Sequence, residues 1–247
     1  MLKLVKLLEC NSNTIIFAVY FKVMDRLLQN IKIAINDNIY VKDPESSELG
    51  RRIIEYSIVL IDEIGFEAFT FRKLGERIGS NESSIYRYFE NKHKLLVYLS
   101  SWYWGWLEYQ LVFATHGVPD PEEKLSRAIE IISRNKVEDQ NFGHINEVLL
   151  TRIVINESSK SYLTKEVKQE NRDGYFVIYK RMVHRLEEMI RTCNPNYKYT
   201  TSLASTIMET SLHQHFLKEH LPSLTNGGED NATTTFIKEM VFSTIKK

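Results

Sequence analysis

Residues 70–96, TFRKLGERIGSNESSIYRYFENKHKLL, decide the fold of this chain of 247 residues. The stretch predicts two short helices joined by a tight turn and followed at once by a longer helix. Thr70 is a candidate N-cap, because its hydroxyl can accept a hydrogen bond from an unpaired N–H of the first helical turn. Gly79 lies where the end of the first helix favours a left-handed residue. This order of elements is typical of a helix-turn-helix.

The second short helix, expected over about residues 82–88, carries side chains that are unusual for a solvated helix. Ile85 and Phe89 fall on its inner side. The opposite side presents hydroxyl, aromatic and cationic groups, from Ser83, Ser84, Tyr86, Arg87 and Tyr88. Such a surface suits a DNA major groove, because short side chains let the helix backbone approach the base edges.

An amphipathic helix is expected upstream, in RRIIEYSIVLIDEIGFEAF (residues 51–69), and Gly65 stops it. The order of helix, Gly stop, Thr cap, helix-turn-helix, Tyr-x-Tyr-Phe, Asn-Lys and Leu-Leu resembles the N-terminal domain of the tetracycline-repressor (TetR) family of bacterial transcription regulators. The resemblance covers about residues 47–98. Its most specific part is SIYRYFENKHKLL, residues 84–96.

The resemblance implies contacts with double-stranded DNA, position by position. The helix that crosses the DNA backbone would begin with Thr70, Arg72 and Lys73. Base-facing positions would be filled by Glu82, Ser83, Ser84 and Tyr86, with Arg87 beside them. Phosphates would be gripped by Tyr88 and Lys92. Lys92 would lie at a helix N-terminus, where the dipole also favours an anion.

Charge sets a condition on this interpretation. The chain has 43% hydrophobic residues, 26% charged residues and no net charge. Within residues 47–95, eight Lys and Arg balance eight Asp and Glu. DNA affinity must therefore come from the placement of cations rather than from bulk charge. A neutral domain predicts weak non-specific binding, so we expect specificity to be carried by a homodimer.

Residues 1–46 are expected to form an N-terminal extension, partly disordered. Two interpretations stay open for residues 1–23: a poorly packed extension, or sequence upstream of a true initiator at Met24. The apolar run at residues 14–21 is shorter than the ~20 residues that span a bilayer, so no membrane partner is expected. Residues 30–43 alternate apolar and polar side chains around Asn36-Asp37-Asn38, which predicts a hairpin or an extended arm. Such an arm would brace the DNA-binding domain or, alternatively, lie along the duplex.

Residues 96–247 are expected to form a helical domain for effector binding and dimerisation. The helices are predicted at about residues 92–115, 121–136, 143–156, 160–192, 201–219 and 232–245. Cys10 and Cys193 have neither the spacing of a zinc site nor that of a disulfide framework. We therefore expect reduced thiols in a cytoplasmic protein.

Aromatic residues in the first of these helices are candidates for an effector cavity. A cavity for a flat apolar or aromatic effector would be lined by Trp102, Tyr103, Trp106 and Tyr109. The alternative is that these residues form core and helix interfaces. Trp104 points away from their stripe, so it must be exposed, at an interface or in a pocket.

Apolar faces near the C-terminus are candidates for a dimer interface built as a four-helix bundle. Their residues are Leu203, Met208, Leu212 and Phe216 on one helix and Phe236 and Met240 on the last. Core packing within one subunit is the competing interpretation. Glu209 and His213 have a spacing that can hold a metal, but no third ligand falls in register, so neither metal nor cofactor is expected.

The sequence therefore predicts an all-α protein with an N-terminal three-helix helix-turn-helix domain at residues 47–95. We expect a non-enzymatic, homodimeric transcription regulator, a repressor that binds a near-palindromic operator and is released by a small effector. Two alternatives stay open. One is a TetR-like fold that acts as a protein-interaction module, and the other is a metal-binding enzyme.

Overall fold

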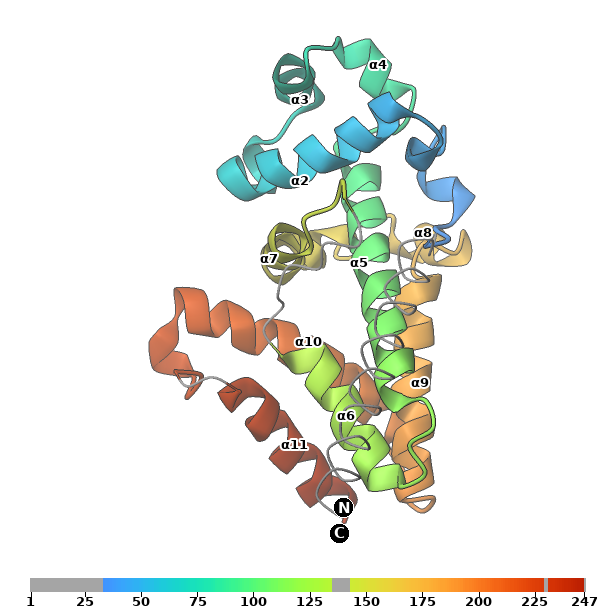
Figure 1. Ribbon diagram of the computed structural model, residues 1–247, viewed down its shortest axis with the longest axis vertical. Coiled ribbons are helices and arrows are strands. Elements are labelled where there is room, and N and C mark those ends of the chain that lie inside the picture. Colours follow the sequence, from blue (N-terminus) through green and yellow to red (C-terminus); the bar gives the residue numbers. More distant parts are fainter. Residues whose placement is uncertain (1–32, 135–142, 229–230, 247) are drawn as a thin grey trace, which may run out of the picture.

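The computed structural model describes residues 33–134, 143–228 and 231–246, and these residues form helices and no strand. The α-helices, labelled as in Figure 1, are α2 (Glu48–Ala68), α3 (Phe71–Ile78), α4 (Glu82–Tyr86), α5 (Lys92–Thr115), α6 (Pro121–Ser133), α7 (Glu147–Glu157), α8 (Val167–Arg172), α9 (Val177–Cys193), α10 (Thr200–His220) and α11 (Ala232–Ile245). Short 3-10 turns are η1 (Asp37–Ile39), η2 (Pro44–Ser46), η3 (Ser158–Ser161) and η4 (Pro222–Leu224). The predicted all-α class is confirmed. Among the described residues, none of the helices combines the length and apolar character needed to span a bilayer.

Local capping places the three N-terminal helices where the sequence predicts them. The Thr70 hydroxyl accepts a hydrogen bond from the Lys73 N–H at 3.2 Å and begins α3. Gly79 ends α3 with φ of 64°, a left-handed conformation in which glycine has no Cβ penalty. Gly65 interrupts α2 with φ of 75°. Asn81 then caps α4, as its side chain accepts from the Ser84 N–H at 2.8 Å.

Helix α5 is the central element of the molecule. It begins beside α4 and runs down between α7, α6 and α9, so that α3 and α4 lie at the opposite end of the molecule from α11 (Figure 1). Nearly every α5 residue from Leu95 to Glu108 is buried. A helix that is apolar all round needs neighbours on every side, which explains its central position.

Of the two forms expected for residues 30–43, a hairpin or an arm, the described part forms an arm, which extends over residues 33–47. The described part of that hairpin, residues 33–43, contains no strand, and residues 30–32 lie outside the description, as do residues 1–23 and Cys10. The Asn36 side chain accepts from the Asn38 N–H at 2.9 Å and starts a 3-10 turn instead. Ile33, Ile35 and Ile39 are buried in the same core as α5. The alternation of apolar residues therefore indicated burial correctly but not strand pairing.

The predicted helix at residues 160–192 is wrong, because the chain breaks there into η3, α8 and α9. Gly174, with φ of 84°, lies between α8 and α9 and turns the chain. Its left-handed conformation favours glycine, so this residue was the available signal for the break.

Helix α7 supports the helix-turn-helix from below (Figure 1). Arg152 of α7 binds Asp62 of α2 through two hydrogen bonds of 2.8 and 2.5 Å. The Glu157 carboxylate accepts from the Phe66 N–H at 3.1 Å, close to the Gly65 break. These contacts fix the position of α2 on the C-terminal helices.

Candidate nucleic-acid interface and effector cavities

Most of the predicted DNA-contacting side chains are solvent-exposed at one end of the molecule. The exposed residues are Thr70, Arg72, Lys73, Ser83, Tyr86 and Arg87, while Glu82 and Ser84 are half-buried. They come from α3, α4 and the residues next to them, at the end of the molecule far from α10 and α11 (Figure 1). The fold therefore gathers hydroxyl and cationic groups on one surface that the C-terminal helices leave uncovered.

The cationic side chains of α3 form only weak, exposed contacts within the protein. Arg72 forms an ion pair with Glu76 at 3.2 Å, and its side chain is 80% exposed. The Lys73 ammonium donates to the Ala68 carbonyl at 2.8 Å, also at the surface. Exposed pairs of this kind contribute about 0–1 kcal/mol, so both side chains can turn to a phosphate at little cost.

Glu82 bonds to a neighbour on its own helix. The Tyr86 hydroxyl donates to the Glu82 carboxylate at 3.2 Å. Desolvation and this carboxylate raise the pKa of Tyr86, so its hydroxyl stays protonated. The Tyr86 ring packs edge-on against Phe71 with centroids 5.0 Å apart. Tyr86 is therefore both a surface group, 47% exposed, and a contact between α3 and α4.

Tyr88 does not lie on this surface, although the resemblance implies a phosphate contact. Its side chain is 3% exposed, and its hydroxyl lies 2.8 Å from the Ser47 hydroxyl and 3.5 Å from the Lys42 ammonium. The hydrogen bond with Ser47 is the main cause that lowers the pKa of Tyr88. The Val41 N–H donates to the Tyr88 carbonyl at 2.8 Å. Tyr88 thus joins the arm to the helix-turn-helix.

Lys92 is also engaged within the protein. Its ammonium donates to the carbonyls of Phe66, Glu67 and Phe69 at 2.9, 3.0 and 3.2 Å. These three bonds use all three donors of the ammonium group. Lys92 therefore satisfies carbonyls at the end of α2, and the structure gives it a bracing position rather than a free phosphate-binding one.

The predicted effector residues are mostly core. Trp102 and Trp106 are buried and Tyr109 is half-buried, and none of these three lines either of the two cavities that α5 reaches. Tyr103 lines a cavity of about 450 Å³ between α5, α6, α7 and α10. Trp104, which the sequence left unplaced, lines a second cavity of about 240 Å³. The core interpretation therefore describes Trp102 and Trp106 correctly.

Three of the predicted dimer residues are also core. Leu203, Met208 and Leu212 are 7%, 0% and 9% exposed within a single chain, so the competing interpretation applies to them. The apolar period of α10 does not distinguish a face that packs on α9 from one that packs on a second copy. The remaining candidates are Phe236, which is 47% exposed, and Phe216 and Met240, which are half-buried.

The metal-binding alternative finds no support in the described ranges, where no group of three or more His, Cys, Asp or Glu side chains converges. Glu209 accepts hydrogen bonds from the Tyr179 and Tyr162 hydroxyls at 2.5 and 3.2 Å. His213 stacks on Phe216 with centroids 6.1 Å apart. The two side chains that have metal-binding spacing therefore have other contacts.

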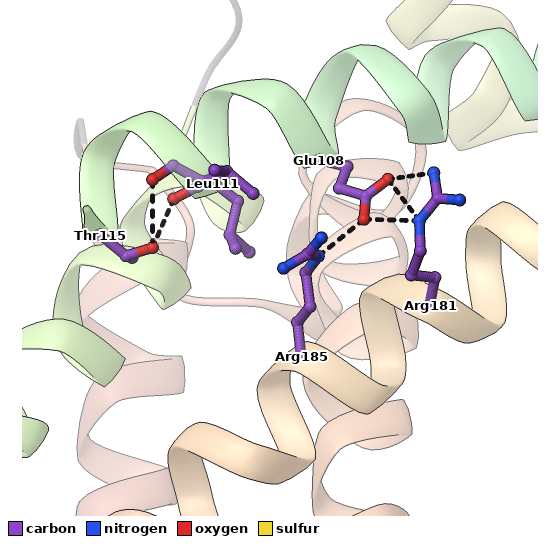
Figure 2. Close-up of polar contacts among 6 residues, drawn as sticks. Glu108, Leu111, Thr115, Arg181 and Arg185 are labelled. Carbon is purple, nitrogen blue, oxygen red and sulfur yellow. Dashed lines mark hydrogen bonds and ion pairs between the residues drawn. The ribbon is translucent and has the colours of Figure 1, made fainter. Parts of the chain in front are cut away.

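Figure 2 shows a charge cluster around a buried carboxylate, which sequence reasoning missed. Glu108 of α5, 6% exposed, accepts hydrogen bonds from Arg181 at 2.7 Å and Arg185 at 2.6 Å, both from α9. The available signal was a lone carboxylate in the apolar stretch of α5 together with two arginines four positions apart. The cluster fixes α5 against α9.

Residues 53–99 match the family model for bacterial regulatory proteins of the tetR family. No curated protein is significantly similar to the sequence. The matched residues contain the helix-turn-helix and the first part of α5.

Solved structures with this fold include AibR in complex with isovaleryl coenzyme A and operator DNA, at 18% identity and TM-score 0.53, with 78% of this chain and 98% of that chain covered. The TetR-family transcriptional regulator PfmR from Thermus thermophilus has 17% identity and TM-score 0.51, with coverage of 79% and 97%. A regulator from Saccharomonospora viridis in complex with choline has 17% identity and TM-score 0.52, with coverage of 81% and 97%. At these identities the likeness shows the fold. Residues 53–99 therefore match the tetR family of bacterial regulatory proteins, and most of the chain shares the fold of these solved structures.

Proposed function

We propose that this protein is a sequence-specific DNA-binding transcription regulator, a repressor that binds a near-palindromic operator as a homodimer. The observation that carries the proposal is the uncovered surface of α3 and α4, with exposed Arg72, Lys73, Ser83 and Arg87. The family match over residues 53–99 supports the same function. Residues 47–95 would bind DNA, and residues 96–247 would bind effector and partner chain.

The contacts divide by chemistry. Arg72, Lys73 and the Thr70 hydroxyl would bond phosphate oxygens and fix the position of α4 on the duplex. Ser83, Ser84 and Tyr86 would meet base edges, with Arg87 beside them. Since the domain has no net charge, each cation placed on a phosphate contributes a large share of the affinity.

Dimerisation is proposed through the outer faces of α10 and α11. Phe236 is 47% exposed, and Leu224, which lines the same surface hollow as Phe236, is 64% exposed. Contiguous exposed apolar groups are typical of protein interfaces. A twofold dimer would place two α4 helices about 34 Å apart, or a multiple of that, to match the two half-sites of an operator.

Effector control is proposed through α5, which reaches from the helix-turn-helix to both cavities. A ligand that favours one position of α5 would change the separation of the two α4 helices. The coupling free energy equals the ligand's differential affinity for the two positions, typically about 1–3 kcal/mol. Structures with this fold hold isovaleryl coenzyme A and choline, which supports a small-molecule effector.

Selection of genomic fragments by the purified protein tests the proposal. Wild type, Arg72→Ala and Arg127→Ala are compared at low and physiological salt. Arg127→Ala is a matched control, because Arg127 forms an exposed ion pair with Glu123 four positions away on α6, as Arg72 does with Glu76 on α3.

Wild type and Arg127→Ala are expected to enrich the same few sites that share an inverted repeat. Arg72→Ala is expected to bind them more weakly, with the slope of log affinity against log salt reduced by about one phosphate contact. Equal enrichment by Arg72→Ala would remove Arg72 from the interface. Failure of all three proteins to enrich any sequence would instead favour a protein-interaction module.

A further inference from the structure

The cavity of about 240 Å³ lies where α5, η3, α9 and α10 meet, and aromatic rings form part of its wall. The rings are those of Trp104, Tyr162, Tyr175, Phe176 and Tyr179. Trp104 and Tyr179 pack edge-on with centroids 5.1 Å apart. Drug-sized molecules occupy cavities of about 300–1,000 Å³, so this one suits a smaller ligand.

An exposed carboxylate, which has no counter-ion among the described residues, lines this cavity. Glu209 lines it and accepts hydrogen bonds from the Tyr179 and Tyr162 hydroxyls at 2.5 and 3.2 Å. Burial raises the pKa of Tyr162 to about 12 and that of Tyr179 further, so both phenols remain donors. Within the ranges that the structure describes, Glu209 has no ion pair, in contrast to Glu108 and its two arginines in Figure 2.

The only cationic side chain in the wall is turned outwards. Lys180 lines the cavity mouth, but it is exposed and its ammonium donates to the Asn171 side chain. Lys180 therefore supplies its apolar stem to the wall and does not neutralise Glu209.

We propose that this cavity binds a small organic cation, with its ammonium group against Glu209 and the surrounding rings. Aromatic faces attract an ammonium through their quadrupole, most strongly where water is excluded, and the carboxylate adds a charge-assisted contact. The inference rests on the proposed effector-controlled function and names the chemical class of the effector.

Calorimetric titration of the full chain tests this with three cations, tetramethylammonium, benzyltrimethylammonium and phenethylammonium, and with 2-phenylethanol as a neutral analogue of the last. The variants are Glu209→Gln, which removes the charge and keeps the shape, and Glu219→Gln, on the same helix, which lines the 450 Å³ cavity and so reports whether a cation binds there instead. Thermal unfolding of each variant shows whether it is folded.

At least one cation is expected to bind wild type and Glu219→Gln more tightly than 2-phenylethanol does. The same cation is expected to bind folded Glu209→Gln at least about tenfold more weakly than it binds wild type. Absence of binding by all three cations at millimolar concentration would overturn the proposal, as would equal binding by Glu209→Gln. If Glu209→Gln does not fold, the comparison with 2-phenylethanol decides instead. Binding of all three cations to wild type no more tightly than 2-phenylethanol would then overturn the proposal. Selection of genomic fragments measures DNA binding separately. Absence of cation binding in a protein that still selects DNA fragments would therefore reject the proposed ligand class and leave the proposed DNA-binding function standing.

Discussion

At the scale of single residues, the predicted DNA contacts differ in what they already bond to within the protein. Arg72 and Lys73 have surface partners that are easily exchanged. Lys92 and Tyr88 bond to groups that lie far away in the sequence, and both hold elements together. Arg72 and Lys73 are therefore available for the proposed interface, whereas Lys92 and Tyr88 bond within the scaffold.

Lys92→Ala is expected to lower the free energy of unfolding by about 2 kcal/mol, because three carbonyls at the end of α2 lose a charged donor. Urea unfolding at neutral pH measures this. Arg87→Ala, an exposed cation in the same domain, is the control and should change stability by less than about 0.5 kcal/mol. Unchanged stability of Lys92→Ala, with weakened DNA binding, would favour the phosphate role that the resemblance implies.

Glu108→Gln is expected to destabilise the fold by about 1–2 kcal/mol at pH 7. This is less than expected for a fully buried ion pair, because Arg181 and Arg185 are 48% and 40% exposed and solvent screens their charges. Burial alone would raise the pKa of Glu108, but the hydrogen bonds and charges of both arginines outweigh it and hold that pKa below the ordinary 4.5. A carboxyl with a lowered folded pKa stabilises at pH values above its unfolded pKa and loses that contribution as pH falls through the folded pKa.

The difference in unfolding free energy between wild type and Glu108→Gln should therefore be constant at neutral pH and shrink as pH falls below about 4.5. Denaturant unfolding of both proteins at several pH values measures it. A difference that grows on acidification would contradict the ion-pair assignment.

Part of the candidate site could be predicted from the sequence because its hydrogen-bond partners lie close together in the chain. The caps of α3 and α4 bond to N–H groups three positions away, so the sequence shows both partners. The carbonyls bound by Lys92 lie 23 to 26 positions away, and Glu108 lies more than 70 positions from its arginines. Such partners depend on how α2, α5 and α9 pack, which a local pattern does not contain.

At the scale of elements, the arm at residues 33–47 connects both parts of the molecule. Its Val41 and Ser47 bond to Tyr88 of the helix-turn-helix. On the other side, the Asn36 amide donates to the Asp173 carbonyl at 2.9 Å, and the Tyr175 hydroxyl donates to the Asn38 carbonyl at 3.0 Å. The arm therefore braces the DNA-binding domain, one of the two roles expected from its sequence.

The packing of the arm on α5 can be tested at Gly105. A Cβ at Gly105 would lie 2.4 Å from Cγ2 of Ile33, so Gly105→Ala is expected to cost about 1–3 kcal/mol. In the double variant Gly105→Ala/Ile33→Ala the clash is absent, and the measured cost should fall well below the sum of the single changes. Strict additivity in urea unfolding would show that the arm does not rest on α5.

At the scale of the whole molecule, the C-terminal helices contribute both to the core of one chain and to its exposed surface. The apolar spacing in α10 does not show which of its residues belong to which. Leu203, Met208 and Leu212 belong to the core of one chain, whereas Phe236 stays exposed on α11. A partner copy on this face would cover Phe236 and leave α3 and α4 free at the other end (Figure 1). The proposed dimer and the proposed DNA surface are therefore compatible.

Phe236→Glu is expected to raise the dissociation constant of the dimer by about tenfold or more, since it buries a charge in an apolar contact. Phe113→Glu is the control, because Phe113 is similarly exposed, at 42%, but lies near the end of α5. Sedimentation over a range of concentrations measures both. Equal self-association of the two variants would place the dimer interface elsewhere.

The most direct test of the central claim is the mass of the complex between this protein and a selected duplex that carries the inverted repeat. Two chains per duplex are expected, with half-sites centred about 10 base pairs or a multiple apart, and scrambling one half-site should abolish tight binding. A single chain per duplex, or binding that survives the scrambled half-site, would contradict a dimeric regulator that reads its operator through paired α4 helices.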